Sequence, residues 1–298
     1  MIPEDAITPT LPALLGLRRS VQGRVPARRG RHGSSGIAPS PLRGRGMEYA
    51  ESREYVAGDD ARHIDWRLTA RSGRAHTKLF QAERDRLTLI VADTAPALYF
   101  GTRVRFKSVQ AARAGAVAAW AALRDGDRIA ALRGSSREPP IAPAGGMRSV
   151  LRVLDALRRW YTCPPVDDAG LGLALDHARR VLRPGSRMVV LAEPASVLAV
   201  DASRWAGLAR HAEVIVLLLT DPFEQRPPRA RLPFATASAH LDLDLSSAAQ
   251  RAQWARDFAQ PLQQARTQLS ALGIHAVELP ADADSAAWLP APRRREVA

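Results

Sequence analysis

The sequence predicts an α/β fold: a doubly wound, largely parallel sheet covered by helices on both faces. From residue 87 onward, short apolar runs alternate with longer amphipathic stretches, which is typical of this class. The first run, residues 87–92 (LTLIVA), is continuously apolar, as expected for a strand buried on both faces. With 298 residues, of which 46% are hydrophobic, the chain can bury a large core.

The individual elements follow from periodicity. Apolar residues at helical spacing predict helices, and short apolar runs between them predict strands. The strands are expected at residues 87–92, 127–132, 187–192, 214–219 and 274–279. The helices are expected at residues 106–123, 150–161, 171–182, 205–210 and 254–272, the last kinked or restarted by Pro261. A hairpin-like stretch is expected at residues 231–245.

Three acidic residues lie just after the ends of predicted strands. Asp93, Glu193 and Asp221 come after the strands at residues 87–92, 187–192 and 214–219. Functional groups of doubly wound sheets gather at the carboxyl ends of the strands. The sequence therefore places these three side chains near one edge.

Residues 1–46 read as a flexible basic tail. Residues 18–45 contain eight arginines and no acidic residue, and only residues 11–17 form a short apolar patch. Such a stretch has too little apolar surface to offset the entropy lost on ordering. Clustered arginines can bind phosphates, but no aromatic residues are interleaved to stack on bases. The alternatives are a solvated basic tail or one docked on an acidic face of its own domain. Residues 281–298 are expected to be a C-terminal tail.

Residues 47–86 form a segment dense in charge. Strands are expected near residues 49–56 and 75–80, with one helix between them, at residues 61–71. Asp59 or Asp60 is a suitable N-cap for that helix, and Gly73 lies where a left-handed C-terminal cap belongs. Trp66 falls on a different helix face from Ile64 and Leu68. If its indole anchors the segment in the core, truncation costs about 3–5 kcal/mol; a much smaller loss indicates exposure and favours a partner contact.

Three interpretations compete for the charges of this segment. The carboxylates could bind a metal, but neighbouring arginines compete for the same oxygens. His63 could act as a ligand or base, but no second histidine or nucleophile lies at a usable spacing. A network of ion pairs and caps is favoured over a partner-recognition surface and over catalysis.

Cysteine usage and hydropathy bear on the compartment. Cys163 is the single cysteine, which excludes an intramolecular disulfide and fits a reducing compartment. The apolar runs are too short to cross a bilayer, and the N-terminus has no signal-peptide pattern. A cytoplasmic protein without a membrane span is expected. Its formal net charge of +13 is compatible with binding to nucleic acid, an anionic membrane surface or an acidic protein.

Several motifs resemble one family. GRGMEYAESREYVAGDDARHIDWRLTAR, TLIVADTAPALYFGTR and RHAEVIVLLLTDPFE are similar to members of the domain-of-unknown-function 58 family. The resemblance covers residues 43–224 and implies a von Willebrand factor type A-like domain at residues 87–280, preceded by a family-specific segment at residues 47–86. It also implies a partnership with MoxR-type AAA+ ATPases. The matching motif residues are Arg53, Tyr55, Gly58, Asp59, Asp60, Arg62, Asp65, Trp66 and Arg71.

An A-type domain implies a metal site of the form Asp-x-Ser-x-Ser after the first strand. Here the sequence reads Asp93-Thr94-Ala95-Pro96-Ala97, so both serine positions hold alanine. A Ser-Asp pair expected after a later strand is Ala192-Glu193. Mg²⁺ needs near-octahedral oxygen ligands. Asp93, Glu193 and Asp168 remain weak candidates; no metal and no other cofactor is expected.

Two functions follow as alternatives. The first is a non-enzymatic adaptor or co-chaperone of a MoxR-type AAA+ ATPase, which rests on the resemblance and on the lack of a coherent nucleophile-base set. The second is a nucleic-acid-associated protein that uses the arginine-rich tail, whose binding would fall steeply with salt.

Overall fold

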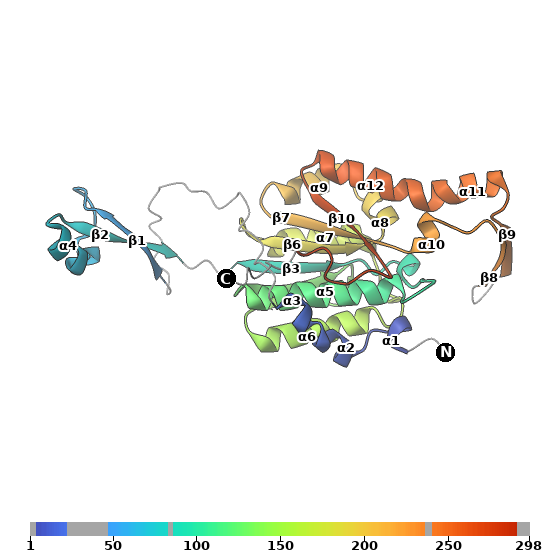
Figure 1. Cartoon of the computed structure of the whole chain (residues 1–298), viewed down its shortest axis with the longest axis horizontal. Helices are drawn as coiled ribbons and strands as arrows, with labels where there is room; N and C mark the ends of the chain where they lie inside the picture. Colours follow the sequence, from blue (N-terminus) through green and yellow to red (C-terminus); the bar gives the residue numbers. More distant parts are fainter. Residues whose placement is uncertain (1–3, 23–46, 83–85, 236–239, 291–298) are drawn as a thin grey trace, which may run out of the picture. The chain divides into compact units, whose positions relative to one another are not determined.

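The chain consists of two compact units. The computed structural model describes residues 4–22, 47–82, 86–235 and 240–290 (Figure 1). The large unit comprises residues 1–33 and 86–298, and the small unit comprises residues 34–85. None of the helices in these described stretches is long and apolar enough to cross a membrane.

The large unit is built on a six-stranded sheet in the order β10-β7-β6-β3-β4-β5. All neighbouring strands are parallel except β4 and β5, so the predicted, largely parallel α/β architecture is confirmed. The sheet strands are β3 (Leu87–Ala92), β4 (Arg128–Arg133), β5 (Ile141–Ala144), β6 (Arg187–Ala192), β7 (Glu213–Thr220) and β10 (His275–Pro280).

Helices cover both faces of this sheet (Figure 1). Along β3, Ile90 and Ala92 point into a core shared with α5 and α6, whereas Leu89 and Val91 point into a second core beneath α7, α9 and α12. This alternation explains why the strand sequence is apolar throughout. The longer helices are α5 (Lys107–Arg124), α6 (Met147–Trp160), α7 (Gly170–Val181), α9 (Ala202–Ala209), α11 (Ala248–Trp254) and α12 (Gln260–Ala271). Short helical turns are η2 (Pro96–Leu98), α8 (Pro194–Leu198) and α10 (Pro222–Gln225).

The central helix α5 packs unusually close to its neighbours. Most of its residues are buried, and alanines supply much of the buried surface. A side chain at Gly115 would place its Cβ 2.9 Å from Leu157 of α6 and 3.0 Å from Leu191 of β6. Small residues on this face therefore fix the distance between α5, α6 and the sheet.

The N-terminal residues correct the predicted tail. Residues 4–22 form three short helices, α1 (Glu4–Ile7), α2 (Leu11–Gly16) and α3 (Arg18–Val21). Leu14, Leu17 and Val21 are buried in the core with α5 and α6, and the Trp120 indole donates to the Leu14 carbonyl at 3.1 Å. The patch at residues 11–17 thus docks on the domain. The rest of the predicted tail, residues 23–46, lies outside the described residues.

The C-terminal boundary also extends beyond the predicted residue 280. Ala281, Ala286 and Leu289 are buried. Arg105 Nη1 donates to the carbonyls of Ala281 and Ala283, both at 2.9 Å, which ties this segment to the start of α5. Residues 281–290 are therefore part of the large unit rather than a tail, and residues 291–298 lie outside the described residues.

The stretch after β7 contains the predicted hairpin and the interrupted helix. Strands β8 (Arg231–Ala235) and β9 (His240–Asp244) pair antiparallel. Helix α11 passes through a π-helical turn, η3 (Ala255–Ala259), before continuing as α12, with Pro261 in the first turn of α12. The change of register falls where the proline cannot continue the hydrogen-bond ladder, as predicted.

The small unit is a β-hairpin with a helical insertion. Strands β1 (Met47–Glu54) and β2 (His76–Ala82) pair antiparallel and confirm the two predicted strands. The single predicted helix at residues 61–71 is wrong: a 3₁₀ turn, η1 (Ala61–His63), precedes a separate helix, α4 (Trp66–Ser72). Gly73 ends α4 at φ +68°, as the sequence predicted.

Candidate functional site

Acidic residues gather at the carboxyl edge of the large sheet, as predicted from the strand ends. Asp93 follows β3, Glu193 follows β6 and Asp221 follows β7, and these strands are neighbours. The buried Asp93 carboxylate accepts the amides of Ala95 and Glu193, each at 3.0 Å. Burial raises the pKa of Asp93, an effect that these amides oppose. Asp93 therefore links the end of β3 to the end of β6 through the Glu193 amide.

A buried lysine lies among the other carboxylates. Lys107, the first residue of α5, is 0% exposed. Its Nζ lies 2.5 Å from Glu224 Oε1 and 3.8 Å from Glu193 Oε1. Burial raises the pKa values of Glu193 and Glu224, and the Lys107 ammonium acts in the opposite direction. The structure thus provides one internal cation for a pair of mostly buried carboxylates.

Both carboxylates also cap short helices. Glu193 accepts the Ala195 amide at 2.6 Å, and Glu224 Oε2 accepts the Asp221 amide at 2.9 Å. Asp221 in turn accepts the Phe223 amide at 2.9 Å and the Thr102 hydroxyl at 2.5 Å. This edge is consequently a closed network of caps and ion pairs.

The residues at this edge do not fit a magnesium site. Thr94 Oγ1 is buried without a hydrogen-bond partner in the described parts of the chain, but the two serine positions of the motif hold alanine. Asp168 accepts the Gly170 amide at 3.1 Å, and Glu193 is paired with Lys107. Among the described residues, no group of three or more His, Cys, Asp or Glu side chains is arranged to hold a metal ion. The expected lack of a functional metal stays a prediction, to which Lys107 adds a physical reason.

Lys107 and Glu224 were not singled out from the sequence. The signal was present: a lone lysine at the start of an apolar helix, in a domain whose other basic residues are arginines. Lys107 begins the helix that follows β3, and the start of such a helix lies at the carboxyl edge of the sheet, which could have paired it with the acidic residues there. Which acid it meets depends on the packing of α5 against β6 and β7, which periodicity does not define.

Most charges of the small-unit motif serve its own fold. The Arg53 guanidinium lies 2.6 Å from Asp59, and the Tyr55 hydroxyl donates to the Asp59 carbonyl at 3.3 Å. Gly58 adopts φ +110° in the turn between them. Asp59 also accepts the Val56 amide, and this hydrogen bond is the largest influence lowering its pKa.

Two aspartates of the motif act as helix caps. Asp60 caps η1 and pairs with Arg62 at 2.9 Å, and this guanidinium lowers the pKa of Asp60 to about 2. Asp65 caps α4 by accepting the amides of Arg67 and Leu68, both at 3.1 Å. The second cap explains why one predicted helix became two: each aspartate starts its own.

One face of α4 remains without a role in this network. The Trp66 side chain is 70% exposed, and Arg67, Ala70 and Arg71 are exposed beside it. These positions cover one continuous arc of the helix, since Leu68 and Thr69 occupy the half-buried side. Within the described residues, the Arg67 and Arg71 guanidinium groups make no ion pair. We call Trp66, Arg67 and Arg71 the α4 face.

Trp66→Ala is expected to change the free energy of unfolding by less than about 1 kcal/mol, because a large exposed side chain contributes little to the folded state. Chemical denaturation of the variant and of wild type measures this difference. A loss of about 3–5 kcal/mol, the cost of removing a buried tryptophan, would contradict the exposed position.

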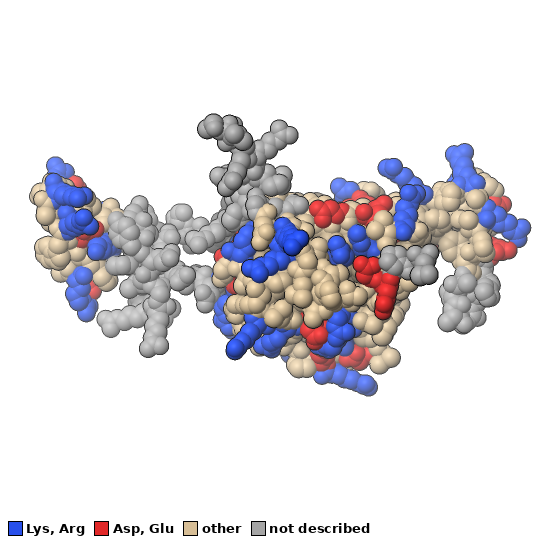
Figure 2. Space-filling model, turned by 60° about the horizontal axis from the view of Figure 1, so that its bottom comes forward, with Lys and Arg blue, Asp and Glu red and all other residues tan. Residues whose placement is uncertain are grey.

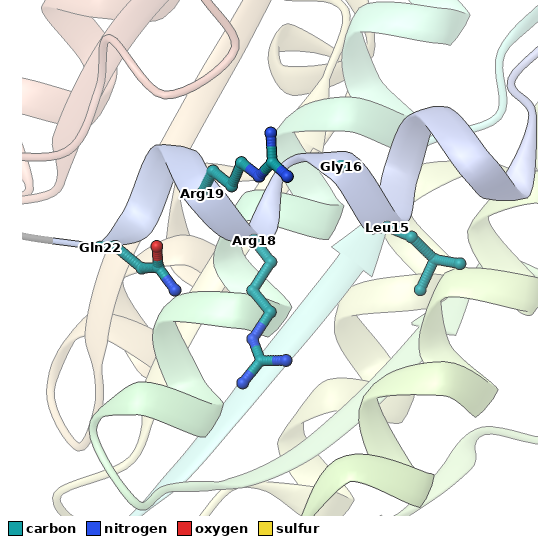
Figure 3. A pocket seen from close by; sticks show the side chains of 5 residues that line it. All are labelled: Leu15, Gly16, Arg18, Arg19 and Gln22. Atoms are coloured by element: carbon teal, nitrogen blue, oxygen red, sulfur yellow. The ribbon is translucent and has the colours of Figure 1, made fainter.

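A second arginine-bearing feature lies on α2 and α3 of the large unit. A hollow of about 550 Å³ is lined by Leu15, Gly16, Arg18, Arg19 and Gln22 (Figure 3). Arg18 lies 5.7 Å from the centroid of the Trp120 ring, a cation–π distance that helps to hold α3 on α5. Two of the eight arginines of the predicted tail thus belong to the folded unit. The other six, at positions 24, 28, 29, 31, 43 and 45, lie outside the described residues.

Basic residues are distributed rather than gathered on the visible face of the large unit. In Figure 2, blue and red side chains are interspersed on this face. The formal charge of +13 therefore does not produce one large basic field there. Ion pairs between arginines and acids, such as Arg133 with Asp167 at 2.7 Å, account for part of this pattern.

Comparison with known proteins extends these observations. Residues 51–264 match the family described as "Protein of unknown function DUF58". The chain is 30% identical over 194 residues to the uncharacterized proteins Rv1480 of Mycobacterium tuberculosis and Mb1516 of Mycobacterium bovis. This alignment covers 65% of the chain and spans 60% of the length of these curated relatives. The matched residues include β2, the sheet strands β3 to β7 and the whole α4 face. The chain belongs to the DUF58 family.

Proposed function

We propose that this chain is a non-enzymatic adaptor or co-chaperone that binds a MoxR-type AAA+ ATPase. The large unit would be a von Willebrand factor A-like domain whose metal site is degenerate. The choice of partner rests on the sequence resemblance to the family. The observation that supports binding itself is the α4 face, an exposed tryptophan beside two arginines that form no ion pair with any described residue. The other charged motif residues, by contrast, form ion pairs or cap helices within the small unit.

The residue types of the α4 face suit protein recognition. Tryptophan and arginine are enriched among residues that dominate binding energy at protein interfaces. Trp66 offers a large apolar surface, and the Arg67 and Arg71 guanidinium groups can each form bidentate pairs with carboxylates. An acidic, partly apolar surface on the ATPase would match this face.

The carboxyl edge of the sheet supports recognition that does not use a metal. In this chain Lys107 already neutralises Glu224 and lies near Glu193. A bridging divalent cation would compete with this ammonium for the same oxygens. Partner binding is therefore expected to be unaffected by removal of divalent cations from the adaptor.

The test is a binding measurement between the purified chain and a purified MoxR-type AAA+ ATPase from the same organism. Trp66→Ala should weaken binding about 30-fold or more, the effect of losing a contact worth about 2 kcal/mol. Arg71→Ala should weaken it less. Arg74→Ala is the matched control for Arg71→Ala, because Arg74 is also exposed but pairs with Glu54 at 2.9 Å.

The alternative outcome is nucleic-acid binding through the arginine-rich stretch. Binding to a nonspecific duplex that falls steeply between low and moderate salt, together with no affinity for the ATPase, would replace the adaptor proposal. If the Trp66→Ala and Arg74→Ala variants bind the ATPase equally well, the interface does not include the α4 face.

A further inference from the structure

Exposed arginines from two adjacent helix ends lie at the amino edge of the sheet, opposite the acidic edge. Helix α7 leads into β6, and α9 leads into β7, the strand beside β6. The Gly185 amide donates to the His211 carbonyl at 3.1 Å, which joins the two connections. Both connections carry arginines that are exposed to solvent. We call these residues, Arg179, Arg180, Arg183 and Arg210, the amino-edge cluster.

The packing of α7 beside α9 holds the cluster in place. Leu175 of α7 and Leu208 of α9 are buried in the same core. On the outer side, Arg204 of α9 lies 3.5 Å from Asp176 of α7. The two helices therefore lie side by side, and their ends present the arginines from a firmly packed surface.

The cluster has a surplus of positive charge. Within the described stretches, none of its four guanidinium groups forms an ion pair. The acids of this edge pair with other arginines: Glu213 with Arg187 at 3.1 Å, Asp125 with Arg124 at 2.7 Å and Asp127 with Arg86 at 3.1 Å. The carboxyl ends of α7 and α9 contribute about half a negative charge each, so a surplus of about three charges remains.

The residue types around the cluster indicate the kind of partner. In residues 170–212, all of them described, no large apolar side chain is exposed, and Trp205 is 0% exposed. Binding to a membrane surface uses apolar anchors, and binding to single-stranded nucleic acid uses exposed aromatic rings. Protein interfaces concentrate binding energy in tryptophan, tyrosine and arginine, of which only arginine is exposed here. The phosphate backbone of a duplex requires only cations.

We propose that the amino-edge cluster binds the phosphate backbone of duplex DNA without reading its sequence. Each guanidinium group can donate two hydrogen bonds to one phosphate, and the release of counterions supplies most of the affinity. Proteins that bind duplex RNA also contact its 2′-hydroxyl groups. Because the cluster consists of guanidinium groups alone, its chemistry fits DNA better.

The test measures binding of a fluorescein-labelled DNA duplex of about 20 base pairs to the full-length chain by fluorescence anisotropy. The salt concentration is varied between about 50 and 200 mM. Arg183→Gln/Arg210→Gln removes one charge from each connection and keeps the length of the side chains. The slope of log K against log salt should become less steep by about 2, because each lost phosphate contact contributes about 0.9.

The matched control is Arg158→Gln/Arg159→Gln, which removes the same two charges from another part of the large unit. Both arginines lie at the end of α6 and pair with Asp155, at 3.0 and 3.3 Å. This control should retain nearly all of the salt dependence of wild type. The arginine-rich stretch at residues 18–45 is identical in every variant, so a difference between them reports on the amino edge alone.

Three results would overturn the proposal. The first is the absence of DNA binding at about 50 mM salt. The second is an equal loss of DNA affinity in Arg183→Gln/Arg210→Gln and in the control variant, which would place the contact elsewhere on the chain. The third is tighter binding of an RNA duplex or of poly-glutamate than of DNA, which would indicate a different class of partner.

The proposal does not rest on the adaptor function, since the amino-edge cluster and the α4 face belong to different units. Arg183→Gln/Arg210→Gln should weaken DNA binding and leave ATPase binding unchanged. Trp66→Ala should do the reverse. The two proposals can therefore fail separately.

Discussion

Lys107→Met is expected to lower the free energy of unfolding of the large unit by about 3–5 kcal/mol, the cost of removing one partner from a buried ion pair. Methionine fills a similar volume, so the loss reflects charge rather than a cavity. Without the ammonium, Glu224 loses a contact of 2.5 Å and Glu193 loses its nearest cation, at 3.8 Å. Urea unfolding monitored by fluorescence measures the effect.

A double variant separates the charge from packing. Glu224→Gln removes one of the stranded charges but keeps an oxygen that can cap α10. Lys107→Met/Glu224→Gln should therefore be more stable than Lys107→Met alone. Full stability of Lys107→Met would show that the carboxylates are neutralised in another way. If Mg²⁺ raises the melting temperature of wild type but not that of Asp93→Ala, a bound metal ion neutralises these carboxylates.

The loss in free energy of unfolding caused by Lys107→Met should depend on pH. Burial raises the pKa values of Glu193 and Glu224 above their usual 4.5, so the folded state holds these protons to higher pH than the unfolded state does. For such groups the stabilising contribution is present below the unfolded pKa and is lost as pH rises through the folded pKa. Removing Lys107 raises both folded pKa values further. The difference in free energy of unfolding between wild type and Lys107→Met should be largest at neutral pH and shrink as pH falls toward about 5.

The sheet of this protein could be predicted because its strands are buried on both faces. Residues 87–92 and 187–192 are apolar apart from Thr88 and Arg187, and their predicted limits match β3 and β6. The acidic edge followed, since residues directly after parallel strands share one end of the sheet. The short strand β5 was missed because Ile141–Ala144 is only partly buried and contains a proline, which carries little strand signal.

The site was less predictable because it depends on contacts between distant residues. Lys107 and Glu224 are 117 positions apart, and only the packing of α5 beside β7 brings them together. In the small unit, Asp59 or Asp60 was predicted to cap one helix, and local pattern did not show that Asp65 would cap a second, separate helix. The exposure of Trp66 likewise depends on how the insertion folds, since an indole on a helix face of its own can either pack on the core or face solvent.

The predicted tail was wrong for residues 4–22 for a related physical reason. The composition of residues 1–46 as a whole predicts disorder, but Leu11, Leu14 and Leu17 lie at helical spacing and find a face already built by α5 and α6. A helix as short as α2 is marginal alone, so its stability comes from this packing. The average composition of residues 1–46 therefore did not reveal that residues 4–22 pack on the large unit.

Leu14→Ala tests that docking directly and should destabilise the large unit by about 2–5 kcal/mol, the range for removing a fully buried leucine side chain. Leu14 is 0% exposed, and its carbonyl accepts the Trp120 indole, so the helix sits deep against α5. Leu15→Ala is the matched control, because the adjacent residue has the same side chain but is 37% exposed. Urea unfolding measures the loss in free energy of unfolding of each variant. Equal and small losses in both would show that residues 4–22 do not pack on the large unit. A large loss at Leu14 alone would establish that the domain begins before the arginine-rich stretch.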